Sequence, residues 1–252
     1  MTFEASLARL ACLSNDDLAT VWMFRGTPMD QGYALFHALE EEQRAVIKAP
    51  RAPSEAARIL SLAQSAFGDL RGLLAGIDDG LLDRAPSAGE WSVRETLAHL
   101  IGAERTYRAN TQYSIARRAE EPILMAAERR PQPDPLDTSG DVQDIVARFA
   151  ARRAESDLAL ANVADADLAR PTIWGGAEVD VRHRLHRFAS HLVEHTYQCE
   201  KAIRAQGAYG GDARAVARRV GALRGLHERR SDAATVRALD AALAEKARAA
   251  PG

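Results

Sequence analysis

Cysteine is scarce in this sequence. Cys12 and Cys199 are the two cysteines among 252 residues, too few for a disulfide framework. Because disulfides belong to oxidising compartments, we expect a cytoplasmic protein. The first residues include Glu4 and lack the basic-then-apolar order of a signal peptide, which agrees with that expectation.

Long apolar runs and an excess of one charge are also missing. No apolar run approaches the roughly 20 residues of a membrane span, so we expect no membrane contact. The formal net charge is −2, which argues against nucleic acid as the main partner. With 46% hydrophobic residues, the chain is long enough for a sizeable core. We therefore expect a small-molecule substrate and leave open a homodimer.

Signals of β-structure and of nucleotide binding are absent. We find no Rossmann or P-loop glycines, no Cys-x-x-Cys pair, no Gly-x-Ser-x-Gly and no convincing pair of strands. Apolar residues recur instead at helical spacing, which predicts an all-α protein. Four long helices are expected, at Ser54–Ile77, Ser92–Arg117, Val142–Val163 and Val179–Ile203.

The segment 118–140 is long for a connection between bundle helices. It holds four of the ten prolines and ends at Gly140, which excludes a continuous helix. Short connections give antiparallel neighbours. A long one can carry the chain back to the other end, so we expect the second and third helices to run parallel.

Segments outside 54–206 are predicted as helical extensions, at 1–50 and 210–252. At an offset of 150 residues, the N-terminal segment weakly echoes the later chain: Asp30 aligns with Asp180 and Leu35 with Leu185. The echo is either a degenerate repeat or two helices entered by similar turns. The Arg-rich C-terminal segment has the composition of a solvated surface addition.

His191 and His195 are four residues apart in the fourth predicted helix. This spacing puts both imidazoles on one face, where they can chelate one metal ion. The alternative is a pair of histidines satisfied by hydrogen bonds in the core. His99 lies about two turns into the second helix, which a capping box of Ser92 and Glu95 should start. Because bundle helices pack at 8–10 Å, ligands from both helices can meet at one ion.

These residues resemble the DinB/YfiT-like superfamily. The pattern Trp-Ser-x-x-Glu-x-x-x-His at 91–99 is followed about ninety residues later by His-x-x-x-His at 191–195. The resemblance covers roughly residues 54–206. It implies an up-down-down-up four-helix bundle, with additional terminal helices here, and a divalent metal held by His99, His191 and His195.

The resemblance also implies a class of activity. Known members include thiol-dependent transferases that use bacillithiol, mycothiol or glutathione. Three imidazoles leave a metal with an open position, as in catalytic sites, and imidazole ligands suit Zn²⁺ or Ni²⁺. We therefore expect a metal-dependent enzyme such as a thiol S-transferase. The alternative is a non-catalytic metal-binding or stress-associated module. Related sulfoxide synthases need a further domain and a Glu where Tyr197 stands, so we set that hypothesis aside.

Three further residues near the histidines need an interpretation. Arg187 is predicted to contact an anionic group of the substrate, unless acids on neighbouring helices neutralise the arginines there. Gln198 shares the histidine face and is a candidate substrate contact. Cys199 lies about 12 Å along the helix from His191, too far to share its metal ion, and is expected in the core.

Overall fold

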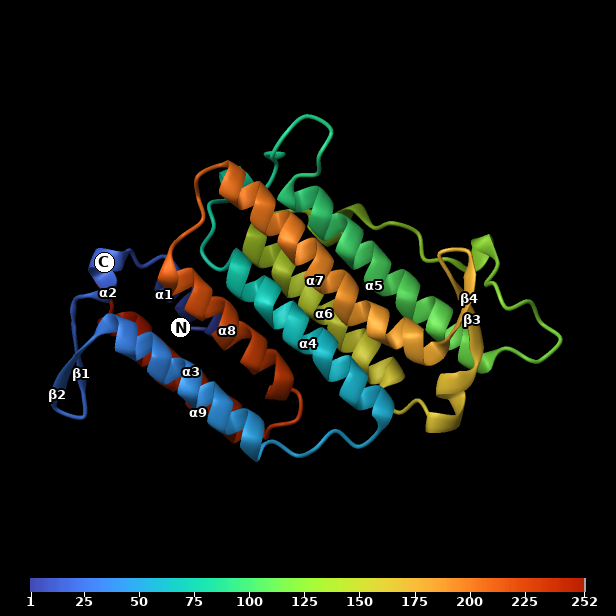
Figure 1. Cartoon of the computed structure of the whole chain (residues 1–252), viewed down its shortest axis with the longest axis horizontal. Helices are drawn as coiled ribbons and strands as arrows, with labels where there is room; N and C mark the ends of the chain where they lie inside the picture. The colour runs from blue at the N-terminus through green and yellow to red at the C-terminus, as the bar shows by residue number, and fades with distance from the viewer. Residues whose placement is uncertain (252) are drawn as a thin grey trace.

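The computed structural model describes residues 1–251 and is predominantly helical (Figure 1). The α-helices are α1 (Phe3–Ala11), α2 (Asn15–Leu18), α3 (Gln31–Lys48), α4 (Glu55–Leu74), α5 (Val93–Ala116), α6 (Val142–Leu160), α7 (Val181–Ala205), α8 (Asp212–His227) and α9 (Ala233–Ala249). The strands are β1 (Val21–Phe24), β2 (Thr27–Asp30), β3 (Pro171–Trp174) and β4 (Ala177–Asp180). The 3₁₀ turns are η1 (Asp79–Leu81), η2 (Ala127–Arg129), η3 (Pro135–Thr138) and η4 (Asp165–Ala169).

Helices α4, α5, α6 and α7 form the predicted four-helix bundle. Each contributes a stripe of buried apolar residues to one core, in which the rings of Phe67 and Phe149 meet edge to face at 4.9 Å. A stripe at helical spacing must be covered on one side, and four such helices cover one another.

The helix directions follow the up-down-down-up order. Arg94 at the start of α5 donates to the carbonyl oxygens of Thr138 and Gly140, just before α6 begins. These two helices therefore run parallel, and the long connection 118–140 carries the chain back between them, as predicted. The first turns of α4 and α7 are joined by an ion pair between Glu55 and Arg182, so α4 and α7 are parallel too.

Two β-hairpins correct the expectation of no strand pair. β1 pairs with β2, and β3 with β4, each antiparallel and four residues long. Each hairpin leads directly into a long helix, α3 or α7. Their turns hold two residues with positive φ, Arg25-Gly26 and Gly175-Gly176. Strands so short carry too little alternation to be recognised from the sequence.

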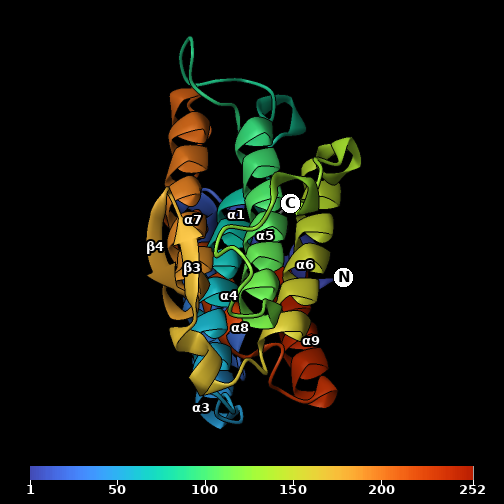
Figure 2. The same ribbon diagram turned by 90° about the vertical axis from the view of Figure 1, so that its right-hand side faces the viewer.

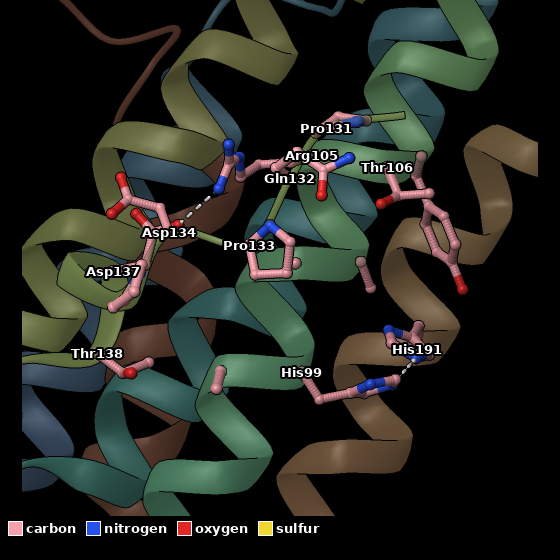
Figure 3. Close-up of a pocket in the computed structure, with 15 residues that line it drawn as sticks. His99, Arg105, Thr106, Pro131, Gln132, Pro133, Asp134, Asp137, Thr138 and His191 are labelled. Carbon is pink, nitrogen blue, oxygen red and sulfur yellow. Dashed lines mark hydrogen bonds and ion pairs between the residues drawn. The ribbon is translucent and has the colours of Figure 1, made fainter. Parts of the chain in front are cut away.

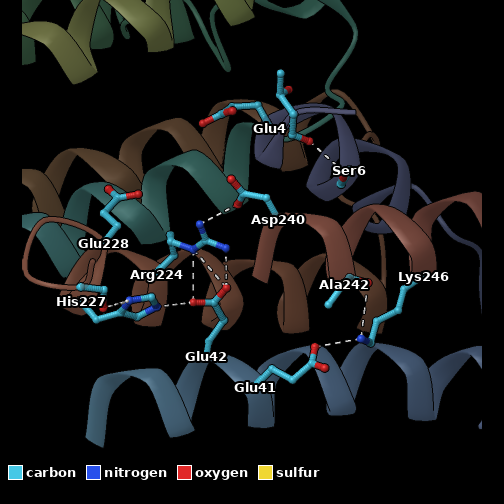
Figure 4. Close-up of polar contacts among 12 residues, drawn as sticks. Glu4, Ser6, Glu41, Glu42, Arg224, His227, Glu228, Asp240, Ala242 and Lys246 are labelled. Atoms are coloured by element: carbon cyan, nitrogen blue, oxygen red, sulfur yellow. Dashed lines mark hydrogen bonds and ion pairs between the residues drawn. The ribbon is translucent and has the colours of Figure 1, made fainter. Parts of the chain in front are cut away.

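The Arg-rich C-terminal segment is also not the surface addition we expected. Helix α8 packs along α4 (Figure 1), and Arg214 and Arg224 are buried. The Arg224 guanidinium donates to the carboxylates of Glu42 and Asp240 (Figure 4). Arginine is tolerated in a core when such charged partners satisfy it.

Helices α1, α3, α8 and α9 form a second group beside the bundle, with an apolar core of their own. Figure 2, turned by 90°, shows the four bundle helices side by side and the β3–β4 hairpin lying against α7. Within residues 1–251, no helix has the length and apolar character needed to cross a membrane.

Candidate metal centre

The three predicted histidines are placed by two capped helices. Ser92 starts α5 in a reciprocal capping box with Glu95, as expected, and puts His99 almost two turns inside the helix. The Asp180 side chain accepts from the backbone N–H of His183 and starts α7. Helices α5 and α7 pack against each other, so their histidine faces meet.

The histidine nitrogens converge on one point. His191 Nε2 lies 3.1 Å from His99 Nε2 and 2.9 Å from His195 Nε2. The nearest ligand atoms of the three residues all lie within 4.8 Å of one another. In a tetrahedral site with metal–nitrogen bonds near 2.0 Å, ligand nitrogens are separated by about 3.3 Å. The arrangement therefore fits a single divalent ion.

Gln198 fixes the orientation of one of these rings. Its Oε1 lies 2.6 Å from His195 Nδ1, and an amide oxygen can only accept a hydrogen bond. The His195 Nδ1–H therefore donates to Gln198, which leaves Nε2 with its lone pair toward the other histidines. Metal-binding histidines commonly use the second nitrogen in this way.

Burial favours the neutral form of two of the three histidines, His191 and His99. Desolvation, together with the neighbouring His195 and His99, lowers the pKa of His191 to about 3. Burial and His195 also lower the pKa of His99. Imidazoles bind a metal only when neutral, so the lowered pKa values of His191 and His99 favour metal binding at neutral pH.

Two aromatic residues lie against the histidines. The Trp91 ring lies 4.9 Å from the ring of His99 and is stacked at 6.1 Å from that of His195. Trp91 therefore forms a wall of the site. The Tyr107 ring lies 5.4 Å from that of His191. Tyr107 belongs to the apolar stripe of α5, so nothing in its spacing singled it out.

The cluster lies between two hollows. The larger one, of about 560 Å³, reaches His99 and His191 and is walled by Tyr107, Arg105 and the proline-rich segment 131–135 (Figure 3). The smaller one, of about 290 Å³, reaches His195 and is lined by Trp91, Gln198, Glu90 and Lys201, among others. A ligand can therefore approach the histidines from either side.

The carboxylates that line these hollows are engaged in ion pairs. In the larger hollow, Asp137 pairs with Arg105 at 3.1 Å, and Asp134 lies 3.5 Å from Arg152. In the smaller hollow, Glu90 pairs with Lys201 at 2.5 Å. Along residues 1–251, the linings thus contain no carboxylate without a basic partner.

The arginines at the start of α7 are held by the protein itself. Arg187 lies over the Trp174 ring at 4.5 Å, and 3.7 Å from the carboxylate of Glu194. It is not among the residues that line the two hollows, so its contact with a substrate stays a prediction. Arg182 pairs with Glu55 on the neighbouring helix, as the alternative interpretation held. Cys199 is buried in the core, and burial raises the pKa of its thiol to about 12.

Comparisons with known proteins agree with this fold. No curated protein matches the chain. A solved structure of YfiT from Bacillus subtilis, described as "a probable metal-dependent hydrolase with an unusual four-helix bundle topology", matches with a TM-score of 0.50 and 16% identity. The match covers 63% of this chain and 93% of that one and shows the fold alone. The family model of the DinB superfamily matches residues 63–199, more than half of the sequence, and the chain therefore belongs to the DinB superfamily.

Proposed function

We propose that this protein is a metal-dependent enzyme that joins a small thiol, through its sulfur, to an electrophile. His99, His191 and His195 are the ligands of a divalent ion, Zn²⁺ or Ni²⁺. The observation that carries the proposal is the convergence of three histidine Nε2 atoms between two hollows. A site with three protein ligands keeps a position free for a reactant.

A metal ion bound there would supply a Lewis acid that lowers the pKa of a thiol and holds it as thiolate. The thiol would release its proton to solvent on binding, its sulfur would form the bond to an electrophilic carbon, and the leaving group would depart with the electron pair of the broken bond. Gln198 keeps His195 in the tautomer that can bind the ion, and Trp91 shields the cluster on one side.

The charges of the two hollows are compatible with a thiol as the nucleophile. Hydrolysis commonly uses a carboxylate or imidazole as general base to take a proton from water. Here Asp134, Asp137 and Glu90 are all engaged in ion pairs. A thiol that has lost its proton on binding needs no base during attack.

The residues that line the two hollows indicate which reactant would occupy each. The smaller hollow has polar side chains, Gln198, Glu90 and Lys201, that suit a hydrophilic thiol carrier. The larger hollow, with Tyr107 and the proline-rich wall, suits the electrophile. A hydrolase is the second candidate, because the structurally similar YfiT is described as a probable metal-dependent hydrolase. A metal-binding module without catalysis is the third.

The test is conjugation of 1-chloro-2,4-dinitrobenzene and other electrophiles with bacillithiol, mycothiol or glutathione by metal-loaded protein. We expect metal-dependent conjugation with at least one thiol, abolished in His195→Ala and kept in His186→Ala, which removes an exposed histidine of the same helix. Ester or amide cleavage that needs no thiol would instead support the hydrolase. Inactivity in both assays, with metal bound, would support the non-catalytic module.

A further inference from the structure

A short sequence occurs in both α4 and α8, the helices through which the four-helix bundle and the second group of helices contact each other. Residues 68–73 of α4 read Gly-Asp-Leu-Arg-Gly-Leu, and residues 221–226 of α8 read Gly-Ala-Leu-Arg-Gly-Leu. The arginines of the two copies, Arg71 and Arg224, are both buried, and both lie over the ring of Phe3, at 4.9 and 4.4 Å. The two helices are thus alike in sequence and in the environment of their arginines.

These helices cross with local two-fold symmetry. A Cβ atom on Gly68 would collide with the carbonyl oxygen of Gly221, and one on Gly221 would collide with that of Gly68. On either side of this contact, Gly225 lies against Gln64, and Gly72 lies against Arg218. The two helices are therefore antiparallel. Each helix therefore contacts the other through corresponding positions of the repeated sequence, as the two subunits of a symmetric dimer do.

The hairpins and the helices that follow them repeat as well, at the offset of 150 residues seen in the sequence. The register Val21↔Asp30 of the first hairpin corresponds to Pro171↔Asp180 of the second. The first N–H of α3, at Gln31, donates to the Thr20 carbonyl at 2.9 Å, and that of α7 donates equivalently at 3.0 Å. Similar turns alone would not reproduce both the pairing and the cap.

The remaining helices also correspond if the second group is put in the order α8, α9, α1, α3. In this order they match α4, α5, α6 and α7. Helix α8 packs on α3 as α4 packs on α7, and α1 packs on α9 as α6 packs on α5. Gln31 at the start of α3 donates to the Ala249 carbonyl at the end of α9, so these two are antiparallel, like α7 and α5. Arg9 near the end of α1 donates to the carbonyls of Ala247 and Ala250, so α1 and α9 are parallel, like α6 and α5.

We infer that residues 212–251 and 1–48 together form a second, circularly permuted copy of the DinB-type bundle, which packs on the first as a built-in partner subunit. Its helices follow the order α8, α9, α1, α3, with the hairpin β1–β2 before the last. The permutation explains why the two terminal segments, which we predicted as separate extensions, share one apolar core.

In the second copy, an ion pair stands at the position of one of the metal ligands. At the offset of 150, His191 and His195 correspond to Glu41 and Ala45. Glu41 faces α9, where Lys246 Nζ lies 2.8 Å from its carboxylate (Figure 4). Lys246 is almost completely buried. The residue that stands at the position of His191 is thus a carboxylate held by an ammonium group.

The second copy serves as a partner because it covers α4. Helices that approach through glycine bring their backbones into close contact and leave no room for another chain between them. The face of α4 opposite its own core is therefore occupied within one polypeptide, and a homodimer, if formed, would use another face. The one metal centre expected per chain accords with one functional and one ligand-free copy.

Native-state hydrogen exchange of the full chain tests this inference. We would compare Leu243→Ala in α9 with Leu97→Ala in α5, two buried leucines of the two cores. Truncating a buried leucine destabilises its own cooperative unit enough to speed exchange by about tenfold or more. We expect Leu243→Ala to speed exchange in α1, α3 and α8 while α5 and α6 change less than about threefold, and Leu97→Ala to do the reverse.

Two results would overturn the inference. One is faster exchange in α8 and α9 with α1 and α3 unchanged, which would make the termini independent. The other is an equal effect of both variants on every helix, which would make the chain a single unit. If Leu243→Ala does not fold, exchange of the wild type in rising urea decides the question. The helices α1, α3, α8 and α9 must then share one urea dependence that differs from that of α5 and α6.

Discussion

The bond between His195 and Gln198 orients the most buried part of the histidine cluster. Because Gln198 Oε1 accepts from His195 Nδ1, the ring is held with Nε2 toward His191. Substitution of a residue that supports a metal ligand in this way typically lowers metal affinity 10–100-fold. Gln198 is therefore assigned first to positioning, and its predicted contact with the substrate stays a separate prediction.

Gln198→Leu is expected to lower Zn²⁺ affinity about 10–100-fold while the fold is kept. Gln198→Glu, which retains an acceptor at the same reach, should keep affinity within about tenfold of the wild type. Competition with a chromogenic chelator measures both. Equal affinities of the leucine variant and the wild type would show that the hydrogen bond does not support the metal centre.

The low pKa of His191 predicts acid sensitivity of the metal-free protein. In the unfolded chain a histidine binds its proton near pH 6.5, whereas in the folded protein His191 does so near pH 3. Between these values the unfolded state binds more protons, so stability falls as the pH falls. Between pH 7 and pH 5, the protonation of His191 in the unfolded chain is expected to lower the free energy of unfolding by about 2 kcal/mol.

Urea unfolding at pH 7 and pH 5, in the presence of a chelator, measures this loss. His191→Gln cannot take up the proton and should lose less stability than the wild type over the same interval. A wild type and variant with the same pH dependence would contradict the depressed pKa.

At the scale of the elements, a buried ion pair fastens α5 to α6. The Arg153 guanidinium is fully buried and donates to Glu104 at 2.6 Å and to Asp157 at 2.8 Å. Burial raises the pKa of Glu104, and the charge of Arg153 opposes that rise. Removing one partner leaves a buried charge without compensation.

Arg153→Ala is therefore expected to lower the free energy of unfolding by about 3–5 kcal/mol. The matched control is Arg108→Ala, which breaks the more exposed pair with Glu155 between the same two helices and should cost less than about 1 kcal/mol. Chemical denaturation of both variants gives the comparison. Similar losses would show that burial does not set the strength of this connection.

Elements were predictable from the sequence where local patterns determine them. The capping box at Ser92 and the apolar stripes placed the four long helices, and the prolines of 118–140 indicated the parallel pair. The hairpins were missed because four-residue strands have no periodicity to detect. The burial of α8 was missed because Arg224 is satisfied by Glu42, 182 residues away in the chain. Such partners become visible only in the folded molecule.

At the scale of the whole molecule, the contact between α4 and α8 holds the two groups together. Gly221→Ala would push a Cβ atom into the carbonyl of Gly68, which the backbone cannot avoid without moving the helices apart. We expect a loss of more than about 2 kcal/mol from overpacking. Gly102→Ala is the control, because a Cβ there meets open space and should stabilise α5 by about 0.5–1 kcal/mol.

Thermal unfolding distinguishes these two glycines, since both variants add one methyl group inside a helix. A lowered midpoint for Gly221→Ala and a raised one for Gly102→Ala is the expected pair of results. A shift in the same direction for both would mean that the close approach of α4 and α8 does not constrain the molecule.

The candidate site was predictable in part. The sequence predicted that the three histidines lie close together. The prediction rested on the spacing of His191 and His195 on one helix face and on the position of His99 after its cap. The two hollows and the ring of Trp91 beside the histidines depend on how α5, α7 and the proline-rich segment pack. Packing of that kind leaves no local signal in the sequence.

The measurement that tests the central claim most directly is the metal content of purified protein, by elemental analysis, for the wild type, His195→Ala and His186→Ala. His186 lies on the same helix and is exposed, so its variant controls for loss of any histidine. The account predicts about one divalent ion per chain in the wild type and in His186→Ala, and almost none in His195→Ala. Equal metal content in all three proteins would contradict it.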